Sequence, residues 1–185
     1  MSRIRIFNAN IITMACGTAV TENGVLTIDG ERISYVGESG AEPEGIKYDR
    51  EIDAKGNIIM PGFKNAHTHS GMTFLRSYAD DLPLDKWLNE SIFPREAKLR
   101  DDDIYWCTKL AVMEYLSSGI TACFDMYLRP YEIARATEEC GFRCVQTGSM
   151  NNFSQSLELQ EEWLNKLNGG SPLTSYMLGY HAEYT

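Results

Sequence analysis

The sequence predicts an α/β fold in which a small β domain precedes a parallel sheet. Residues 1–58 contain short alternating or apolar runs separated by turn residues, a pattern typical of antiparallel strands. From residue 59 onward, apolar runs suited to strands alternate with stretches of helical periodicity, which indicates strands joined by helices. We therefore divide the chain into a small antiparallel β domain, residues 1–58, and a β/α domain, residues 59–185.

The β domain is expected to consist of short strands at residues 3–6, 25–28, 32–36 and 57–60. Asp29-Gly30-Glu31, between the second and third of these, is a hairpin signal because Gly30 can adopt a positive φ. Pro61-Gly62 ends the last run, so a new strand is expected to begin at Phe63. This domain contains no evident catalytic residue.

The β/α domain is expected to contain four strands with helices between them. The clearest helix follows Asp101, where three consecutive carboxylates favour the positive N-terminal end, and it stops at Gly119. The nearly all-apolar strand after it suits a sheet covered on both faces. Pro130 and Gly141 mark the start and the end of the next helix. The expected strands cover residues 63–69, 120–124, 142–146 and 175–180, and the expected helices cover residues 102–118, 130–140 and 157–167.

Composition narrows the class of protein. A chain of 185 residues with 43% hydrophobic content can build one sizeable core. The net charge of −9 argues against a nucleic-acid partner and against an anionic membrane surface. No apolar run approaches the roughly 20 residues that span a bilayer, and the N-terminus lacks a signal-peptide pattern, so we expect a cytoplasmic protein. The five cysteines are expected to be free and to act as small hydrophobes.

Two histidines stand two residues apart in the strand that begins the β/α domain. Side chains two apart on a strand share a face, so His67 and His69 can converge on one ion. Imidazole suits zinc and similar transition ions, and catalytic zinc commonly has three protein ligands and an open position. A bare His-x-His also occurs often by chance, and two polar residues at a strand end are the alternative. By spacing alone, His181 at the end of the fourth strand is a candidate third ligand, and Asp125 a candidate to orient a ligand or cap a loop.

The segment around these histidines resembles a known family. Pro61–Ser70 (PGFKNAHTHS), followed by Met72–Arg76 (MTFLR) and Leu84–Leu88 (LDKWL), is similar to the amidohydrolase superfamily. Within it the chain most resembles the branch of S-adenosylhomocysteine/methylthioadenosine deaminases and related chlorohydrolases. The resemblance extends over essentially the whole chain and implies that this is the N-terminal half of such an enzyme. It implies the first four β/α units of a (β/α)₈ TIM-type barrel, preceded by a small N-terminal β-sandwich domain, with functional groups at the C-terminal strand ends.

The resemblance also implies a chemistry. His67 and His69 would be ligands of one divalent metal per subunit, zinc in the first place, with iron or another transition metal as alternatives. Such an ion lowers the pKa of bound water from about 15.7 towards 7, and the resulting hydroxide attacks an electron-poor ring carbon so that ammonia leaves. The family's remaining ligands, two histidines and an aspartate, and its acid/base groups are expected beyond Thr185. No catalytic residue is therefore expected within the chain itself.

Three further residues match substrate-contacting positions of the family. His181 lies in a segment, Gly179–Tyr184, that resembles the fourth-strand motif whose histidine contacts the substrate near the metal. Glu96 matches a carboxylate that holds the ribose hydroxyls, although it is also compatible with a solvated charge. Trp87 matches the aromatic residue that packs against the base or the thioether end, and a core tryptophan is the alternative. Glu183, beside His181, is a weaker candidate.

One segment departs from the deaminase pattern. Thr147-Gly148-Ser149 stands where those enzymes tend to carry an arginine for the carboxylate end of the substrate. S-adenosylhomocysteine is therefore a less expected substrate than another adenosine-like or heteroaromatic amine.

The predicted function is that of a hydrolase acting on a non-peptide C–N bond of a small-molecule substrate, most specifically a deaminase. A binuclear cyclic-amidase-like hydrolase is the alternative enzyme, which would need a bridging lysine or carboxylate later in the chain. A non-catalytic fragment or interaction module is the other alternative, because half a barrel leaves two open sheet edges. Those edges are also compatible with a homo-oligomer.

Overall fold

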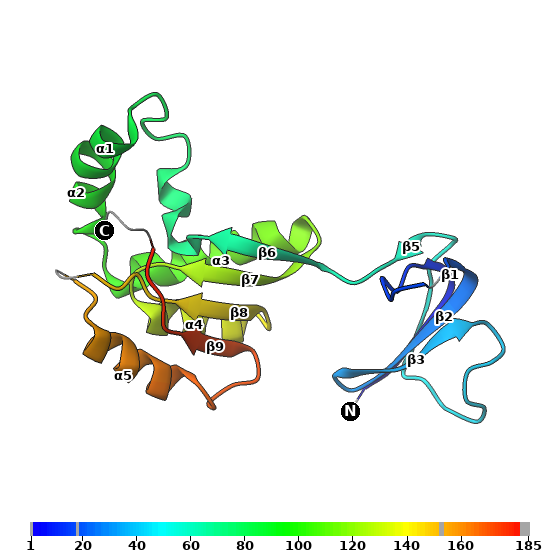
Figure 1. Cartoon of the computed structure of the whole chain (residues 1–185). Helices are drawn as coiled ribbons and strands as arrows, with labels where there is room; N and C mark the ends of the chain where they lie inside the picture. Colours follow the sequence, from blue (N-terminus) through cyan, green and yellow to red (C-terminus); the bar gives the residue numbers. More distant parts are fainter. Residues whose placement is uncertain (1, 18, 152–153, 182–185) are drawn as a thin grey trace. The chain divides into compact units, whose positions relative to one another are not determined.

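The computed structural model describes residues 2–17, 19–151 and 154–181, and Glu183 lies outside them. The chain divides into two compact units, Met1–Pro61 and Gly62–Thr185 (Figure 1). The first consists of strands and the second of strands alternating with helices. The predicted α/β class with a parallel sheet is confirmed by the second unit.

The first unit is a five-stranded sheet in the order β3-β2-β1-β4, with β5 also pairing with β1. Its strands are β1 (Arg3–Ile11), β2 (Thr21–Asp29), β3 (Arg32–Glu38), β4 (Arg50–Asp53) and β5 (Ile58–Ile59). Ala9, Ile11 and Leu26 form its buried core. The described residues of this unit contribute one sheet, so the sandwich expected from the resemblance stays a prediction.

The sheet of the first unit is mixed, whereas a purely antiparallel one was expected. β1 pairs antiparallel with β2, and β2 antiparallel with β3, around the expected hairpin, where Gly30 has φ 61°. However, β4 and β5 both run parallel to β1. A parallel pair needs a long crossover connection, and the β2–β3 hairpin with the segment after it supplies that connection between β1 and β4.

The second unit is built on a four-stranded parallel sheet whose strands follow one another in chain order. They are β6 (Phe63–Thr68), β7 (Ile120–Met126), β8 (Arg143–Thr147) and β9 (Thr174–Met177). Because all four are parallel, their C-terminal ends meet at one edge of the sheet. β9 ends three residues earlier than the strand expected over residues 175–180. His181 therefore lies in the segment after the strand and not directly at the end of the strand.

Helical segments join these strands. Between β6 and β7 the chain forms the 3₁₀ helix η1 (Ser70–Leu75), α1 (Leu84–Lys86), the π-helix η2 (Trp87–Ile92), α2 (Phe93–Glu96) and α3 (Asp101–Ser117). α4 (Pro130–Glu139) joins β7 to β8, and α5 (Leu157–Leu167) joins β8 to β9. The three expected helices are therefore present, and the short helices before α3 are additional.

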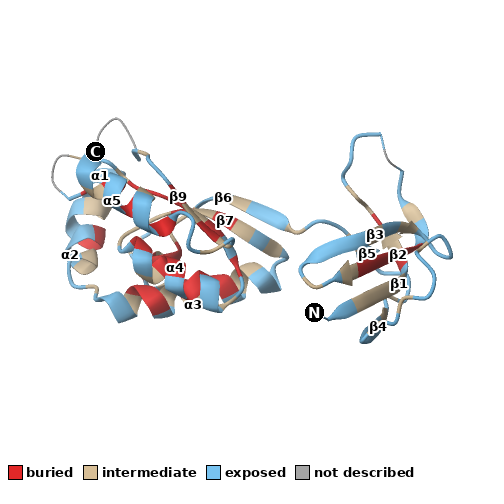
Figure 2. Cartoon of the chain, turned by 90° about the horizontal axis from the view of Figure 1, so that it is seen from below, coloured by how far each residue is buried: buried red, intermediate tan, exposed pale blue. Residues whose placement is uncertain are grey.

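The core of the second unit lies between the sheet and its helices. Ile104 and Val112 of α3 and Ile133 of α4 pack with Phe142 and Cys144 at the start of β8. Figure 2 shows buried segments on α3 and α4 beside exposed ones, as expected for helices with one face on a sheet. All five cysteines are free, as expected.

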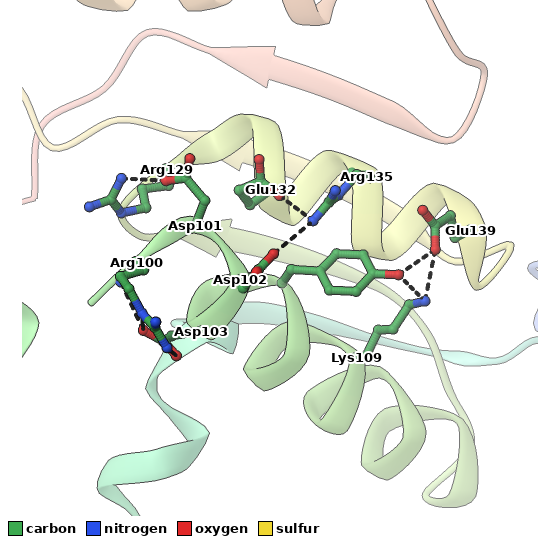
Figure 3. A network of polar contacts seen from close by, with 10 residues as sticks. Arg100, Asp101, Asp102, Asp103, Lys109, Arg129, Glu132, Arg135 and Glu139 are labelled. Atoms are coloured by element: carbon green, nitrogen blue, oxygen red, sulfur yellow. Dashed lines mark hydrogen bonds and ion pairs between the residues drawn. The ribbon is translucent and has the colours of Figure 1, made fainter.

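The outer parts of α3 and α4 are joined by charged side chains (Figure 3). Glu139 accepts hydrogen bonds from Lys109 at 2.7 Å and from the Tyr105 hydroxyl at 2.5 Å. Arg135 lies 2.7 Å from Glu132 on its own helix and 3.8 Å from Asp102 on α3. Asp102, Arg135 and Glu139 leave about half or more of their side-chain surface exposed, so solvent screening weakens these pairs.

No helix in the described part of the chain is long and apolar enough to cross a membrane.

Candidate metal centre and adjoining cavity

His67 and His69 converge where β6 ends. His67 lies in β6, and His69 follows its last residue and precedes η1. The two ring centroids are 5.1 Å apart, with the ring planes at 78°. The alternation of side chains along a strand accounts for this, since it brings residues two apart to one face.

The orientation of the His69 ring is set by β7. Nδ1 of His69 lies 2.5 Å from the main-chain carbonyl oxygen of Met126. A carbonyl oxygen only accepts hydrogen bonds, so Nδ1 carries the proton and donates it. In a neutral imidazole, a proton on Nδ1 leaves Nε2 with its lone pair, and this is the form that binds a metal. A histidine ligand held by a backbone carbonyl through its other nitrogen is a common arrangement around protein metals.

His181 joins this pair from the segment after β9. Its ring centroid lies 5.6 Å from that of His69 and 6.4 Å from that of His67. One ligand nitrogen from each of the three rings falls within 4.8 Å of the others. Partial burial, and the proximity of His69 and His67, lower the pKa of His181, so its imidazole is held neutral. All three histidines of the chain therefore meet at the C-terminal edge of the sheet.

Asp125, in β7, holds the backbone directly after His69. Its carboxylate oxygens accept the Ser70 N–H at 3.2 and 3.3 Å. The side chain is fully buried, and this burial raises its pKa to about 6, although the Ser70 contacts act in the opposite direction. Asp125 is therefore hydrogen-bonded to the residue that directly follows His69.

Asp125 also lies close to two thiols. Cys123, Asp125 and Cys144 each place a ligand atom within 4.8 Å of the others, and the sulfurs of Cys123 and Cys144 are 3.5 Å apart. The hydrogen bond with Cys123, together with burial, raises the pKa of the Cys144 thiol. Thiolate is the form that binds metal, and both cysteines belong to the apolar core. Their role is to pack.

A cavity of about 280 Å³ adjoins the histidines. One wall is apolar and comes from α1, η2 and α2. The polar side chains around it include two of the three histidines, Glu96 and Ser149. Among the described residues that line the cavity, none is lysine or arginine. The apolar wall consists of Leu84, Trp87, Leu88, Ile92 and Phe93.

Trp87 and Glu96 both line this cavity. The indole N–H of Trp87 donates to the carbonyl oxygen of Tyr78 at 3.4 Å. Glu96 is partly buried, and this burial raises its pKa against opposing effects of Tyr127 and His69. The structure thus brings Trp87, Glu96 and His181 to one cavity, beside His69.

Tyr127 lines the same cavity and was not singled out from the sequence. Its ring lies 6.3 Å from that of His69 and covers Gly71, where an added Cβ would meet ring carbons at 2.4 and 2.5 Å. Burial raises the pKa of its phenol, and its buried hydroxyl makes no hydrogen bond of regular geometry with the described residues. Its position directly after a parallel strand is the sequence signal that could have indicated it.

The comparisons with known proteins identify the family. The sequence profile of the amidohydrolase family matches residues 58–173. The chain therefore belongs to the amidohydrolase family, which confirms the resemblance seen around the histidine pair.

Individual relatives are deaminases. The chain is 42% identical to a 5-methylthioadenosine/S-adenosylhomocysteine deaminase of Pelotomaculum thermopropionicum, over 100% of this chain and 44% of that protein. It is 40% identical to a 5'-deoxyadenosine deaminase of Methanococcoides burtonii, over 100% of this chain and 43% of that protein. The crystal structure of an adenosine deaminase from Xanthomonas campestris with bound zinc matches with a TM-score of 0.88 at 26% identity, covering 100% of this chain and 44% of that one. The chain thus spans less than half the length of the relatives it matches.

Proposed function

We propose that this chain is the N-terminal part of a metal-dependent hydrolytic deaminase that acts on an adenosine-like amine. The observation that carries the proposal is the convergence of all three histidines beside a cavity of about 280 Å³ at the C-terminal edge of a parallel sheet. Active sites of barrels built from parallel strands lie at this edge. The deaminase relatives support the reaction type.

In this proposal β6 to β9 are the first four β/α units of a (β/α)₈ barrel, and the N-terminal unit belongs to a β-sandwich. The chain-order succession of the strands supports a barrel, since each new strand is added beside the previous one. The likeness to an adenosine deaminase structure, of which this chain covers 44%, supports a second half of similar size. That half would close the sheet and carry the remaining ligands and the acid/base groups.

His67 and His69 are the proposed metal ligands. The donor set fits a divalent ion of the zinc type, because imidazole nitrogen suits such ions and Nε2 of His69 is not used in the hydrogen bond to Met126. The bound zinc in the Xanthomonas structure supports zinc here. When bound, such an ion would supply hydroxide near neutral pH, by lowering the pKa of water to about 7.

The other residues of the cavity would bind the substrate. We assign to His181 a hydrogen bond to the heteroaromatic ring, since it lines the cavity and its ring centroid lies 5.6 Å from that of His69. Glu96 would accept hydrogen bonds from the ribose hydroxyls, and Trp87 would pack against the base or the 5′ substituent. Asp125 would keep the turn after His69 in place without touching the substrate.

The cavity favours a substrate whose 5′ substituent is uncharged. One of its walls is apolar, and none of its described lining residues is lysine or arginine. Burying the carboxylate of S-adenosylhomocysteine without a cationic partner would cost free energy. We therefore propose a 5′-deoxyadenosine-like or methylthioadenosine-like substrate. One relative is named after 5′-deoxyadenosine, and another after both methylthioadenosine and S-adenosylhomocysteine, so the choice between the last two rests on the cavity.

Metal analysis tests the proposal. The full-length protein that contains this chain is expected to bind one divalent metal per subunit and to release ammonia from adenosine-like amines. A His67→Ala, His69→Ala variant should lose both the metal and the turnover, as measured by elemental analysis and ammonia release. Full metal occupancy in that variant would contradict the proposal, and two metals per subunit in the parent would favour the binuclear hydrolase.

A further inference from the structure

The segment that carries His181 is held at Gly179. The Gly179 N–H donates to the side-chain oxygen Oε1 of Gln160, at 3.1 Å. The Gly179 carbonyl oxygen accepts the N–H of Met150 at 3.0 Å. Both backbone polar groups of the residue two positions before His181 are therefore occupied, one by helix α5 and the other by the loop after β8.

Gln160 makes this contact from a buried position. It lies in α5 and is only 1% exposed, although glutamine usually lies at the surface. A buried amide is costly unless it forms hydrogen bonds. Its hydrogen bond to Gly179 spans 19 residues and so links the helix to the end of the following strand. Packing alone would be served by an apolar side chain, so the amide indicates a positioning role.

Two glycines allow the close approach. A Cβ on Gly148 would meet Cδ and Oε1 of Gln160 at 2.4 and 2.5 Å, and the Tyr176 hydroxyl oxygen at 2.5 Å. A Cβ on Gly179 would meet Oγ1 of Thr147 at 2.2 Å. Neither site has space for a larger residue. The Gln160 amide is thus in close contact with both the loop after β8 and the segment after β9.

We infer that Gln160 is a positioning residue for His181: its amide oxygen fixes Gly179, and this places the His181 imidazole beside His67 and His69. The inference rests on the proposed function, in which His181 contacts the substrate. Gln160 itself does not line the cavity. It acts on the reaction through the backbone of the segment after β9.

A double-mutant cycle on the full-length protein tests this inference. Gln160→Met keeps the length of the side chain and removes the acceptor, and we expect it to lower kcat/KM for the adenosine-like substrate about tenfold, as is typical for residues that orient a ligand. In a His181→Asn background the same change should lower kcat/KM by less than about twofold, because coupled residues are not additive. Equal losses in both backgrounds would overturn the inference, since a general loss of structure does not depend on His181.

The control is an equally buried glutamine in the sheet of the same unit. Gln146 lies in β8 with 2% exposure, directly opposite Tyr176 in the register of β8 and β9. Gln146→Met should change thermal stability to a similar extent but leave the kinetic coupling to His181 near zero. Coupling as strong as that of Gln160→Met would overturn the assignment to Gln160. Gln160→Glu, which keeps an acceptor at the same chain length, should restore part of the lost activity.

Two measurements by nuclear magnetic resonance separate this inference from the proposed function. The ring signal of His181, assigned by its absence in His181→Asn, should shift in Gln160→Met even if the parent shows no deaminase turnover; an unshifted signal would overturn the inference. In the unmodified protein, the Gly179 amide should exchange its hydrogen at least about tenfold more slowly than an unstructured amide, because it is hydrogen-bonded. Exchange at the unstructured rate would overturn the inference without any variant.

Discussion

Nδ1 of His69 donates to the carbonyl oxygen of Met126 at 2.5 Å, so one ring nitrogen of His69 is used for structure and the other is left for a ligand. Substitution can separate the two roles. An asparagine amide nitrogen can take the place of Nδ1, but asparagine has no counterpart of Nε2.

We therefore expect His69→Asn to lose the metal while the metal-free protein keeps its free energy of unfolding to within about 1 kcal/mol, the typical net value of one hydrogen bond. His69→Ala, which loses both groups, should be less stable than His69→Asn. Elemental analysis and denaturant unfolding of the metal-free proteins check these expectations. Metal retained at parental levels in His69→Asn would exclude His69 as a ligand.

The contact between Gly71 and Tyr127 predicts a strict requirement for glycine. An alanine Cβ at residue 71 would lie 2.4 Å from Cδ1 and 2.5 Å from Cε1 of the Tyr127 ring. Such overpacking costs about 1–3 kcal/mol, so Gly71→Ala should lower the free energy of unfolding by that amount in denaturant titrations. Gly170→Ala, where nothing lies within 4 Å of the added Cβ, is the matched control and should be close to neutral.

A second substitution shows whether the Tyr127 ring is the cause. Tyr127→Ala removes the ring, so adding Gly71→Ala to it should cost little further stability, which gives a coupling free energy of about 1–2 kcal/mol. Additive losses would mean that Gly71 is required for a different reason.

The buried carboxyl of Asp125 predicts a dependence of stability on pH. Its pKa is about 6 in the folded protein and near 3.8 ordinarily. Between these values the folded state binds more protons than the unfolded state, so the free energy of unfolding falls as the pH rises from about 4 to about 6 and is then level. The total change attributable to this group is on the order of 3 kcal/mol.

Asp125→Asn should remove that dependence. Asparagine keeps the size of the side chain and an oxygen acceptor for the Ser70 N–H, but it does not titrate. The variant should therefore be more stable than the parent above pH 6 and should approach it below pH 4, as followed by denaturant unfolding of the metal-free protein. An unchanged slope between pH 4 and 6 in Asp125→Asn would show that another group is responsible.

The regular elements of the second unit could be predicted because each has a local signal. Acidic residues begin α3, Gly119 ends it with φ 78°, and Pro130 opens α4. Strand β4 has no such signal: Arg50–Asp53 contains a single apolar residue, and its pairing with β1 depends on tertiary structure. The short helices from α1 to α2 are similarly below the length at which periodicity is detectable.

The candidate site was likewise predictable only where a local pattern in the sequence indicates it. A spacing of two residues in a strand is enough to bring His67 and His69 to one face. No local sequence pattern indicates three other contacts of the site: the Met126 carbonyl with His69, the Tyr127 ring with Gly71, and the Gln160 amide with Gly179. These contacts are determined by tertiary packing. The roles assigned to Trp87, Glu96 and His181 stay predictions until substrate binding is measured.

The last prediction concerns substrate choice. In the segment Thr147-Gly148-Ser149, an arginine could not be accommodated at Gly148, since even a Cβ there collides with Gln160 and Tyr176. Ser149 instead lines the cavity, and its hydrogen bonds are made by its backbone: the N–H donates to Oε1 of Gln155 at 2.7 Å, and the carbonyl oxygen accepts from Nδ2 of Asn151 at 2.7 Å. A larger side chain at residue 149 can therefore enter the cavity without replacing either backbone group.

We expect the full-length parent to act on methylthioadenosine or 5′-deoxyadenosine with a higher kcat/KM than on S-adenosylhomocysteine. Ser149→Arg should raise the relative kcat/KM for S-adenosylhomocysteine by about tenfold or more, because a charge-assisted hydrogen bond to the carboxylate contributes about 1.5–3 kcal/mol. Ser149→Gln controls for size without charge and should leave the ratio unchanged. A parent that already prefers S-adenosylhomocysteine would mean that a cation from outside the described residues reaches the carboxylate, and the preference for an uncharged 5′ substituent would then be wrong.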